Sequence, residues 1–158
     1  MKPSIQSLLL ALSLGTTGMA RAQDSTRYIS PPTLPPTKGY SQVVEVPAGA
    51  RLVYISGQVP LDKEGKVVGV GDFRRQVEQV FTNLETALNE AGATFADVVK
   101  LNFYVLDMTK LQDLREVRDQ HVNQAASPAS TLVEVRKLFR DEVLIEVEAV
   151  AAIVNRGP

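Results

Sequence analysis

Residues 127–135 read SPASTLVEV and residues 144–151 read LIEVEAVA, and these two stretches decide the fold. Both alternate at a period of two residues, which is the period of a β-strand. In the second stretch Ile145 and Val147 point to one face, while Glu146 and Glu148 point to the other. The pattern predicts a half-buried strand that displays two carboxylates on its second face, either as solvated surface or as part of a site.

The residues that precede these strands predict a helix between further strands. Val43–Val46 and Leu52–Ile55 flank a turn at Pro47–Ala50, so they are expected to form a hairpin. Asp72 is the expected N-cap of a helix that stops at Gly92. Its apolar residues recur at three- and four-residue steps: Phe73, Val77, Val80, Phe81, Leu84, Ala87, Leu88 and Ala91.

A central strand and a second helix are expected next. Leu101–Leu106 is rich in residues that favour strands. Thr109 and Gln112 have the spacing of a capping box, which predicts a helix that starts there. Its inward residues are expected to be Leu111, Leu114, Val117 and Val122. The resulting element order predicts an α+β fold in which two helices cover one face of a mixed sheet. The other face then needs a cover, which calls for self-association.

The N-terminal residues have the features of an export signal. Lys2, the apolar run Leu8–Leu14 and Ala20-Arg21-Ala22 predict a signal peptide over residues 1–22, cut after Ala22. An uncleaved anchor is the weaker alternative, because a span needs roughly 20 apolar residues. The mature protein is therefore expected to be secreted or periplasmic and not held in a membrane. Residues 23–38 carry four prolines and predict an extended arm, and residues 39–158 predict one domain.

Composition argues against several classes of site. The chain has one histidine, His121, and no cysteine, so no transition-metal site is expected, and His121 is expected to be a packed structural residue. A formal net charge of −1 with interspersed charges gives no footprint for nucleic acid. Gly69-Val70-Gly71 lacks the third glycine of a dinucleotide fingerprint, and no other cofactor signature is present.

The strands at 127–135 and 144–151, read with Gly39-Tyr40 and Ile55-Ser56-Gly57-Gln58-Val59-Pro60, resemble the RidA/YjgF family of imine and enamine deaminases, also called L-PSP endoribonuclease-like. The resemblance runs from about Gly39 to Ala151. It implies a chorismate-mutase-like mixed sheet, a homotrimer built around three such sheets, and small-molecule clefts between neighbouring subunits, with no metal or cofactor.

The resemblance also implies which residues form the cleft. Glu146 matches the carboxylate that holds a water molecule, and Tyr40 follows the glycine of the family pattern, so both are candidate catalytic residues. Ser56, Gly57, Ser130 and Leu132 are candidate substrate-binding residues. The alternatives are that Tyr40 caps the first strand and that Gly57 serves turn geometry. Glu148 is expected to have a structural or solvated role.

Ser130 stands where the deaminating members carry an arginine. A guanidinium would hold a substrate carboxylate through two charge-assisted hydrogen bonds, whereas serine offers one neutral hydroxyl. Affinity for a 2-imino acid is therefore expected to fall by roughly two orders of magnitude, which favours neutral or differently charged ligands. Arg118, Arg136 and Lys100 are the cations that could substitute from a facing subunit.

Three functions follow from these observations. The first is an exported hydrolase of imines, enamines or a related labile molecule. The second is a non-catalytic trimer that binds a small metabolite in the same clefts. The third is a holdase-like interaction protein that acts through exposed apolar surface. The only feature that supports it is the composition of the proline-rich arm.

Overall fold

A computed structural model describes residues 25–154 of the chain. Its helices and strands are, in order, β1 (Arg27–Ile29), β2 (Val43–Glu45), β3 (Arg51–Gln58), α1 (Phe73–Glu90), β4 (Val98–Val105), α2 (Leu111–His121), β5 (Ala129–Glu134) and β6 (Ile145–Ile153). Short 3-10 turns lie at Phe95–Asp97, Met108–Lys110 and Gln124–Ala126.

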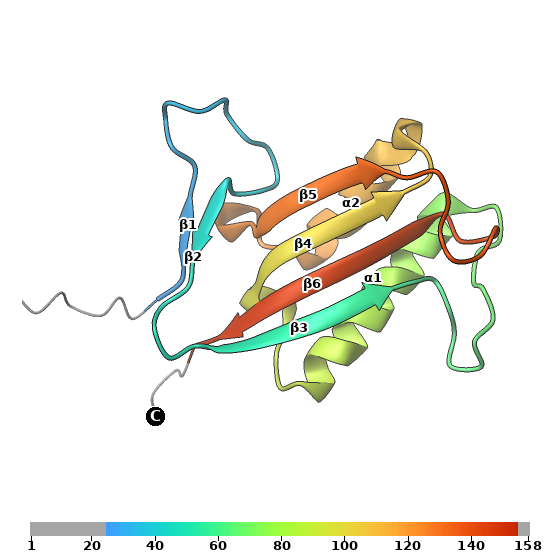
Figure 1. Ribbon diagram of the computed structural model, residues 1–158, viewed down its shortest axis with the longest axis horizontal. Helices are drawn as coiled ribbons and strands as arrows, with labels where there is room; N and C mark the ends of the chain where they lie inside the picture. Colours follow the sequence, from blue (N-terminus) through green and yellow to red (C-terminus); the bar gives the residue numbers. More distant parts are fainter. Residues whose placement is uncertain (1–24, 155–158) are drawn as a thin grey trace, which may run out of the picture.

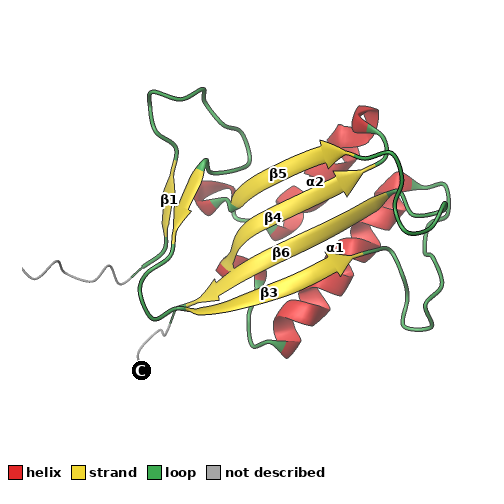
Figure 2. Cartoon of the chain, viewed as in Figure 1, coloured by secondary structure: helices red, strands yellow, loops and turns green. Residues whose placement is uncertain are grey.

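Four strands form the main sheet in the order β3-β6-β4-β5. Strands β4 and β5 run parallel, while β6 pairs antiparallel with both β3 and β4. Helices α1 and α2 pack side by side on one face of this sheet, and no helix covers the other face within residues 25–154 (Figures 1 and 2). The predicted α+β fold, two helices on a mixed sheet, is confirmed.

The two sheet faces differ as the alternation in the sequence predicts. Ile145, Val147 and Ala149 of β6 are buried against the helices, and Glu146 and Glu148 lie on the opposite face. In the neighbouring β4 the core residues are Leu101, Phe103 and Val105. The face without helices is called the open face below.

Helix α1 follows the sequence prediction closely. The Asp72 carboxylate accepts a hydrogen bond from the Arg75 backbone N–H at 3.0 Å, which satisfies a donor at the start of the helix. Gly92 follows the helix end with a φ of 69°, a conformation that glycine adopts without steric cost. Its buried stripe of Val77, Val80, Phe81, Leu84 and Leu88 forms the centre of the core.

The predicted hairpin between residues 43–46 and 52–55 is wrong. β2 pairs instead with β1, in register Tyr28 with Val44, and β3 pairs with β6 at the other end of the chain. The turn at Pro47–Ala50 directs the chain from a small ribbon to the main sheet (Figure 1). Local turn residues permit a hairpin, but the apolar face of β3 gains more by packing beside β6 over the helices.

The predicted start of the second helix is also wrong. Thr109 lies within a 3-10 turn, and its backbone N–H donates to the Asp107 carboxylate at 2.8 Å. The α-helix begins at Leu111. Asp107 caps this 3-10 turn, and its carboxylate also accepts a hydrogen bond from the Thr109 hydroxyl, so that hydroxyl does not cap the α-helix.

The proline-rich segment is partly ordered by pairing, since β1 lies within the predicted arm. The predicted signal peptide at residues 1–22 lies outside the described residues. Within residues 25–154 no helix is both long and apolar enough to cross a bilayer.

His121 is packed at the end of α2. Its ring centroid lies 4.9 Å from that of Phe81 and 4.9 Å from that of Phe95. Burial lowers the pKa of His121, an effect that the nearby Glu85 carboxylate partly opposes. These contacts agree with the structural role expected for this histidine.

Candidate functional site

The candidate site residues lie on both faces of the main sheet. Ser130 of β5 pairs with Leu101 of β4, so its side chain is on the helix-covered face. Glu146 of β6 pairs with Tyr104 of β4, on the open face. One chain therefore does not bring Glu146 and Ser130 together, although both were expected in one cleft.

A pocket of about 260 Å³ opens between β5, helix α2 and the segment that precedes β2. Its lining residues are Lys38, Tyr40, Phe103, Leu111, Leu114, Arg115, Arg118, Ser130 and Leu132. Three of the candidate residues, Tyr40, Ser130 and Leu132, are thus in one place. The volume is slightly below the usual range of about 300–1,000 Å³ for ligand sites, which fits a small molecule. We call this cavity the α2/β5 pocket.

Tyr40 reaches the α2/β5 pocket because its neighbour is tied to β5. The Ser41 backbone N–H donates to the Pro128 carbonyl at 3.1 Å, and Ser41 forms a parallel bridge with Ala129. This pairing sets Tyr40 beside Ser130. Sequence spacing alone could not reveal the contact, because 90 residues separate the two positions.

Gly39 is required by its surroundings. Its φ is 79°, in the left-handed region, and a Cβ at this position would overlap the Arg118 guanidinium, with Cζ only 3.0 Å away. Arg118 in turn donates from Nε and Nη2 to the Asp119 carboxylate at 2.8 and 2.6 Å. The glycine therefore allows the backbone to lie directly on the guanidinium.

Helix α2 contributes two cations that face the α2/β5 pocket. Arg118 was named from the sequence as a possible cation from a facing subunit, yet it lies beside Ser130 in the same chain. The other two cations named from the sequence are not among the lining residues, and Lys100 donates instead to the Thr131 hydroxyl at 2.7 Å. Sequence reasoning missed Arg115, although the positions 111, 114, 115 and 118 form one helical stripe that could have identified it.

Glu146 and Gly57 form a second cluster, on the open face. A Cβ on Gly57 would lie 2.7 Å from the Glu146 Cδ and 2.9 Å from its Cγ. Gly57 has no positive φ and lies inside β3, where the register shifts between Ile55 and Gln58. The alternative that Gly57 serves a turn is therefore wrong, since this glycine instead allows the carboxylate to approach the backbone closely.

The Glu146 carboxylate accepts no hydrogen bond from any residue between 25 and 154. Burial raises its pKa, and the negative charge of Glu148 raises it further. The carboxyl group consequently holds a proton more readily than an exposed glutamate. A carboxyl group that has a raised pKa and accepts no hydrogen bond from the described residues is suited to exchanging a proton with a bound water molecule.

Glu148 has a different environment on the same strand. Its Oε2 accepts from the Asn102 amide at 3.2 Å and from the Tyr104 hydroxyl at 3.1 Å. This hydrogen bond is the main reason that the pKa of Tyr104 is raised. The network gives Glu148 the structural role expected for it.

Ser56 completes the open-face group and is exposed at the end of β3. Its carbonyl accepts from the Gln58 side-chain amide at 3.0 Å. In the part of the chain that the structure describes, no three His, Asp or Glu side chains are grouped to hold a metal ion.

Comparison with known proteins places this geometry in a family. The profile of the Endoribonuclease L-PSP family matches residues 32–153. A RutC family protein of Pyrococcus abyssi is 36% identical over 116 residues, which cover 73% of this chain and 87% of the relative. A 2-iminobutanoate/2-iminopropanoate deaminase of Dermatophagoides farinae is 30% identical over 128 residues, covering 80% and 96%.

Solved structures agree with the sequence relatives. A conserved Rid family protein of Yersinia pestis, YyfB, superposes with a TM-score of 0.75 at 36% identity, covering 81% of this chain and 98% of that one. RidA of an Antarctic Psychrobacter species superposes with a TM-score of 0.60 at 32% identity, covering 80% and 99%. The chain therefore belongs to the Endoribonuclease L-PSP family, to which the RutC and Rid proteins also belong.

Proposed function

We propose that this protein is an exported hydrolase of imines or enamines that works in clefts between the subunits of a homotrimer. The observation that carries the proposal is the division of the candidate residues between two faces of the sheet. Tyr40, Ser130 and Leu132 line the α2/β5 pocket, whereas Glu146 and Gly57 lie on the open face. A second copy of the chain, with its open face against this pocket, is what would unite them.

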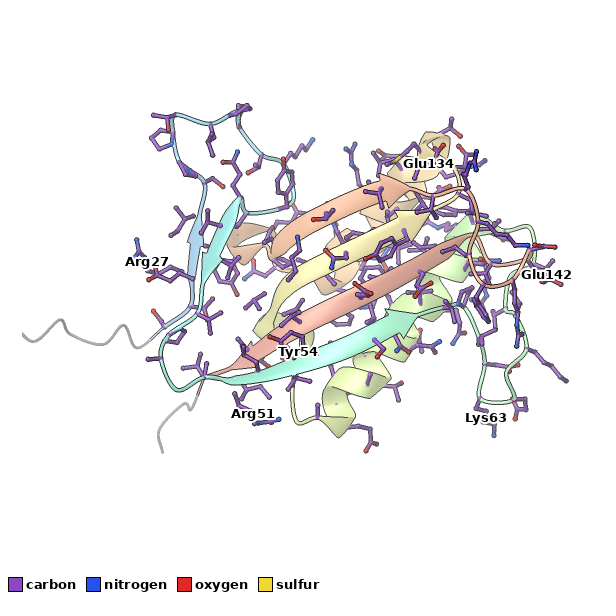
Figure 3. All side chains as sticks on the ribbon, in the orientation of Figure 1. Arg27, Arg51, Tyr54, Lys63, Glu134 and Glu142 are labelled. Atoms are coloured by element: carbon purple, nitrogen blue, oxygen red, sulfur yellow. The ribbon has the colours of Figure 1, made fainter. Side chains whose placement is uncertain are left out.

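The open face has the character of a surface that a second copy covers. Leu52, Tyr54 and Val133 belong to its strands and are exposed, Tyr54 by 76%. Figure 3 shows Tyr54 on the sheet face turned away from the helices. Exposed apolar side chains on a sheet that is otherwise well packed favour an interface. The Rid family protein YyfB of Yersinia pestis shares this fold, with a TM-score of 0.75.

The chemistry needs no cofactor. Glu146 would take a proton from a water molecule as the water oxygen bonds to the imine carbon, and the C=N electron pair would pass to the protonated nitrogen. Glu146 then returns its proton to that nitrogen, and as the C–N bond breaks the new hydroxyl group loses its proton to the carboxylate, which releases ammonia and a carbonyl compound. Positioning and proton transfer supply the acceleration, typically 10²- to 10⁴-fold for the proton transfer alone. The name of the Dermatophagoides relative gives the same reaction class.

The test uses purified residues 23–158 and 2-iminopropanoate generated in the assay. Glu146→Gln should lower kcat/KM by at least about 100-fold, since the amide accepts no proton. Glu142→Gln is the matched control, because this exposed glutamate lies in the loop before β6 and is not among the residues that line the α2/β5 pocket (Figure 3). Equal activity of Glu146→Gln and wild type would contradict the assigned role, and a protein that sediments as a monomer would contradict the composite cleft.

The second candidate function is a non-catalytic small-molecule-binding trimer. The α2/β5 pocket favours it, because this cavity is complete within one chain and does not include Glu146. Saturable binding without turnover on any imine would select this function. The holdase-like alternative would require that suppression of client aggregation be independent of the pocket.

Export remains part of the proposal. Expression with the native leader in a Gram-negative host should yield a mature protein that begins at Gln23, as read from its intact mass. A cytoplasmic product that retains Met1 would contradict it.

A further inference from the structure

The α2/β5 pocket is positively charged. Lys38, Arg115 and Arg118 line it, and no aspartate or glutamate is among its lining residues. Within residues 25–154, neither Lys38 nor Arg115 forms an ion pair. Only Arg118 has an acidic partner, Asp119. Three cations that share one counter-charge around a concave site attract an anion.

Arg118 is the best placed of the three cations. Its side chain is only 14% exposed, so its charge is less screened by water than that of an exposed residue. The pair with Asp119 uses Nε and Nη2 and fixes the plane of the guanidinium. Nη1 donates no hydrogen bond to any described residue and remains available for a ligand. The Gly39 backbone lies close against the same guanidinium.

The remaining walls define what else the ligand carries. Phe103, Leu111, Leu114 and Leu132 supply apolar surface, while Tyr40 and Ser130 offer hydroxyl groups. A cavity of about 260 Å³ with this lining suits a small molecule with one anionic group and a short apolar body.

The small side chain of Ser130 is consistent with a pocket that already has its cations on helix α2. A long cationic side chain at position 130 would project into the small cavity that Arg115 and Arg118 already line, where like charges repel. The small serine leaves the space open. The charge that the family resemblance places on β5 is thus supplied in this chain from helix α2.

We propose that Arg118 anchors the anionic group of the ligand in the α2/β5 pocket, and that the ligand is a small carboxylate with a short apolar body. This inference rests on the proposed function for the choice of a carboxylate, and it reverses the expectation that Ser130 selects neutral ligands. Arg115 and Lys38 contribute a favourable field, while Arg118 donates the hydrogen bond.

The test measures binding, so it does not depend on turnover. The probe is 2-oxobutanoate, which resists hydrolysis, compared with its neutral amide by isothermal titration calorimetry. Wild type should prefer the acid by about 10- to 100-fold, as expected for a charge-assisted hydrogen bond. Arg118→Gln should abolish the preference while the amide still binds as to wild type. Lys137→Gln is the matched control, since Lys137 carries the same charge outside the pocket, beside Asp141.

Relocation of the charge sharpens the test. Arg118→Gln combined with Ser130→Arg should recover the preference for the acid, because a guanidinium again faces the cavity. Ser130→Arg alone should gain less than 10-fold, because the new cation would lie beside Arg118. A preference for the acid that survives in Arg118→Gln, or wild type that binds neither probe, would overturn the inference.

The outcomes separate this inference from the proposed function. If wild type hydrolyses no imine but binds 2-oxobutanoate through Arg118, the hydrolase fails and the anion site stands. If wild type hydrolyses 2-iminopropanoate and Arg118→Gln changes neither KM nor affinity for 2-oxobutanoate, the hydrolase stands and the anion site fails.

Discussion

Gly57→Ala should impair turnover far more than stability. The three atoms nearest to the added Cβ would all belong to the Glu146 side chain: Oε1, Cδ at 2.7 Å and Cγ at 2.9 Å. Because carbon atoms pack at about 3.5–4.0 Å, the carboxylate must move by about 1 Å. A displacement of that size at a reacting group costs up to roughly 100-fold in rate, so kcat/KM for 2-iminopropanoate should fall about 10- to 100-fold.

Stability should change little for two reasons. The Glu146 side chain is flexible and partly exposed, so it can move aside. In addition, Gly57 has no positive φ, and alanine at a compatible position gains about 0.4–1 kcal/mol by restricting the unfolded chain. The free energy of unfolding in urea should therefore shift by less than about 1 kcal/mol.

A double-mutant cycle isolates the contact. In the Glu146→Ala background the added methyl group of Gly57→Ala meets no carboxylate, so its effect on unfolding should be more favourable than in wild type. Identical effects of Gly57→Ala on unfolding in the two backgrounds, together with unchanged turnover of the single variant, would refute the close-approach argument.

Three further predictions concern stability and its dependence on pH. Glu146→Gln should stabilise the fold at pH 7. Because the pKa of Glu146 is raised in the folded protein, the contribution of this side chain to the free energy of unfolding is full below pH 4.5 and is lost as the pH rises. The gain from glutamine should therefore vanish in acid, as urea unfolding at pH 4 and 7 would reveal. Asp72→Ala should cost about 1 kcal/mol through loss of the α1 cap, read from the same urea titration at pH 7, and no change there would discount the cap. The lowered pKa of His121 makes the neutral ring the native form, so stability should fall as pH drops from 6.5, and His121→Leu should flatten that slope; a slope equal to that of wild type would contradict the assignment.

Elements that carry their own periodicity could be predicted from the sequence. The stripe of α1, its Asp72 cap and the alternation of β6 depend on residues within a few positions of one another, and the structure confirms all three. Each pattern is set by the geometry of a single helix or strand. The presence of Glu146 and Glu148 on one face follows from the same rule.

Pairings between distant segments could not be predicted in this way. β2 has a local turn that permits pairing with β3, yet it pairs with β1, because the energy of a strand pair depends on neighbours that sequence order does not specify. The predicted start of α2 was wrong because Asp107 accepts hydrogen bonds from the backbone N–H and the hydroxyl of Thr109, and so caps a 3-10 turn that precedes the helix.

The sequence by itself determined the two-layer fold, the family resemblance and the residue types of the candidate site. Only the tertiary structure decided where those residues meet: Tyr40 and Ser130 share the α2/β5 pocket with Arg118, while Glu146 lies on the opposite face against Gly57. The physical reason is that side-chain periodicity is local to an element, whereas a pocket forms where elements distant in the chain pack together.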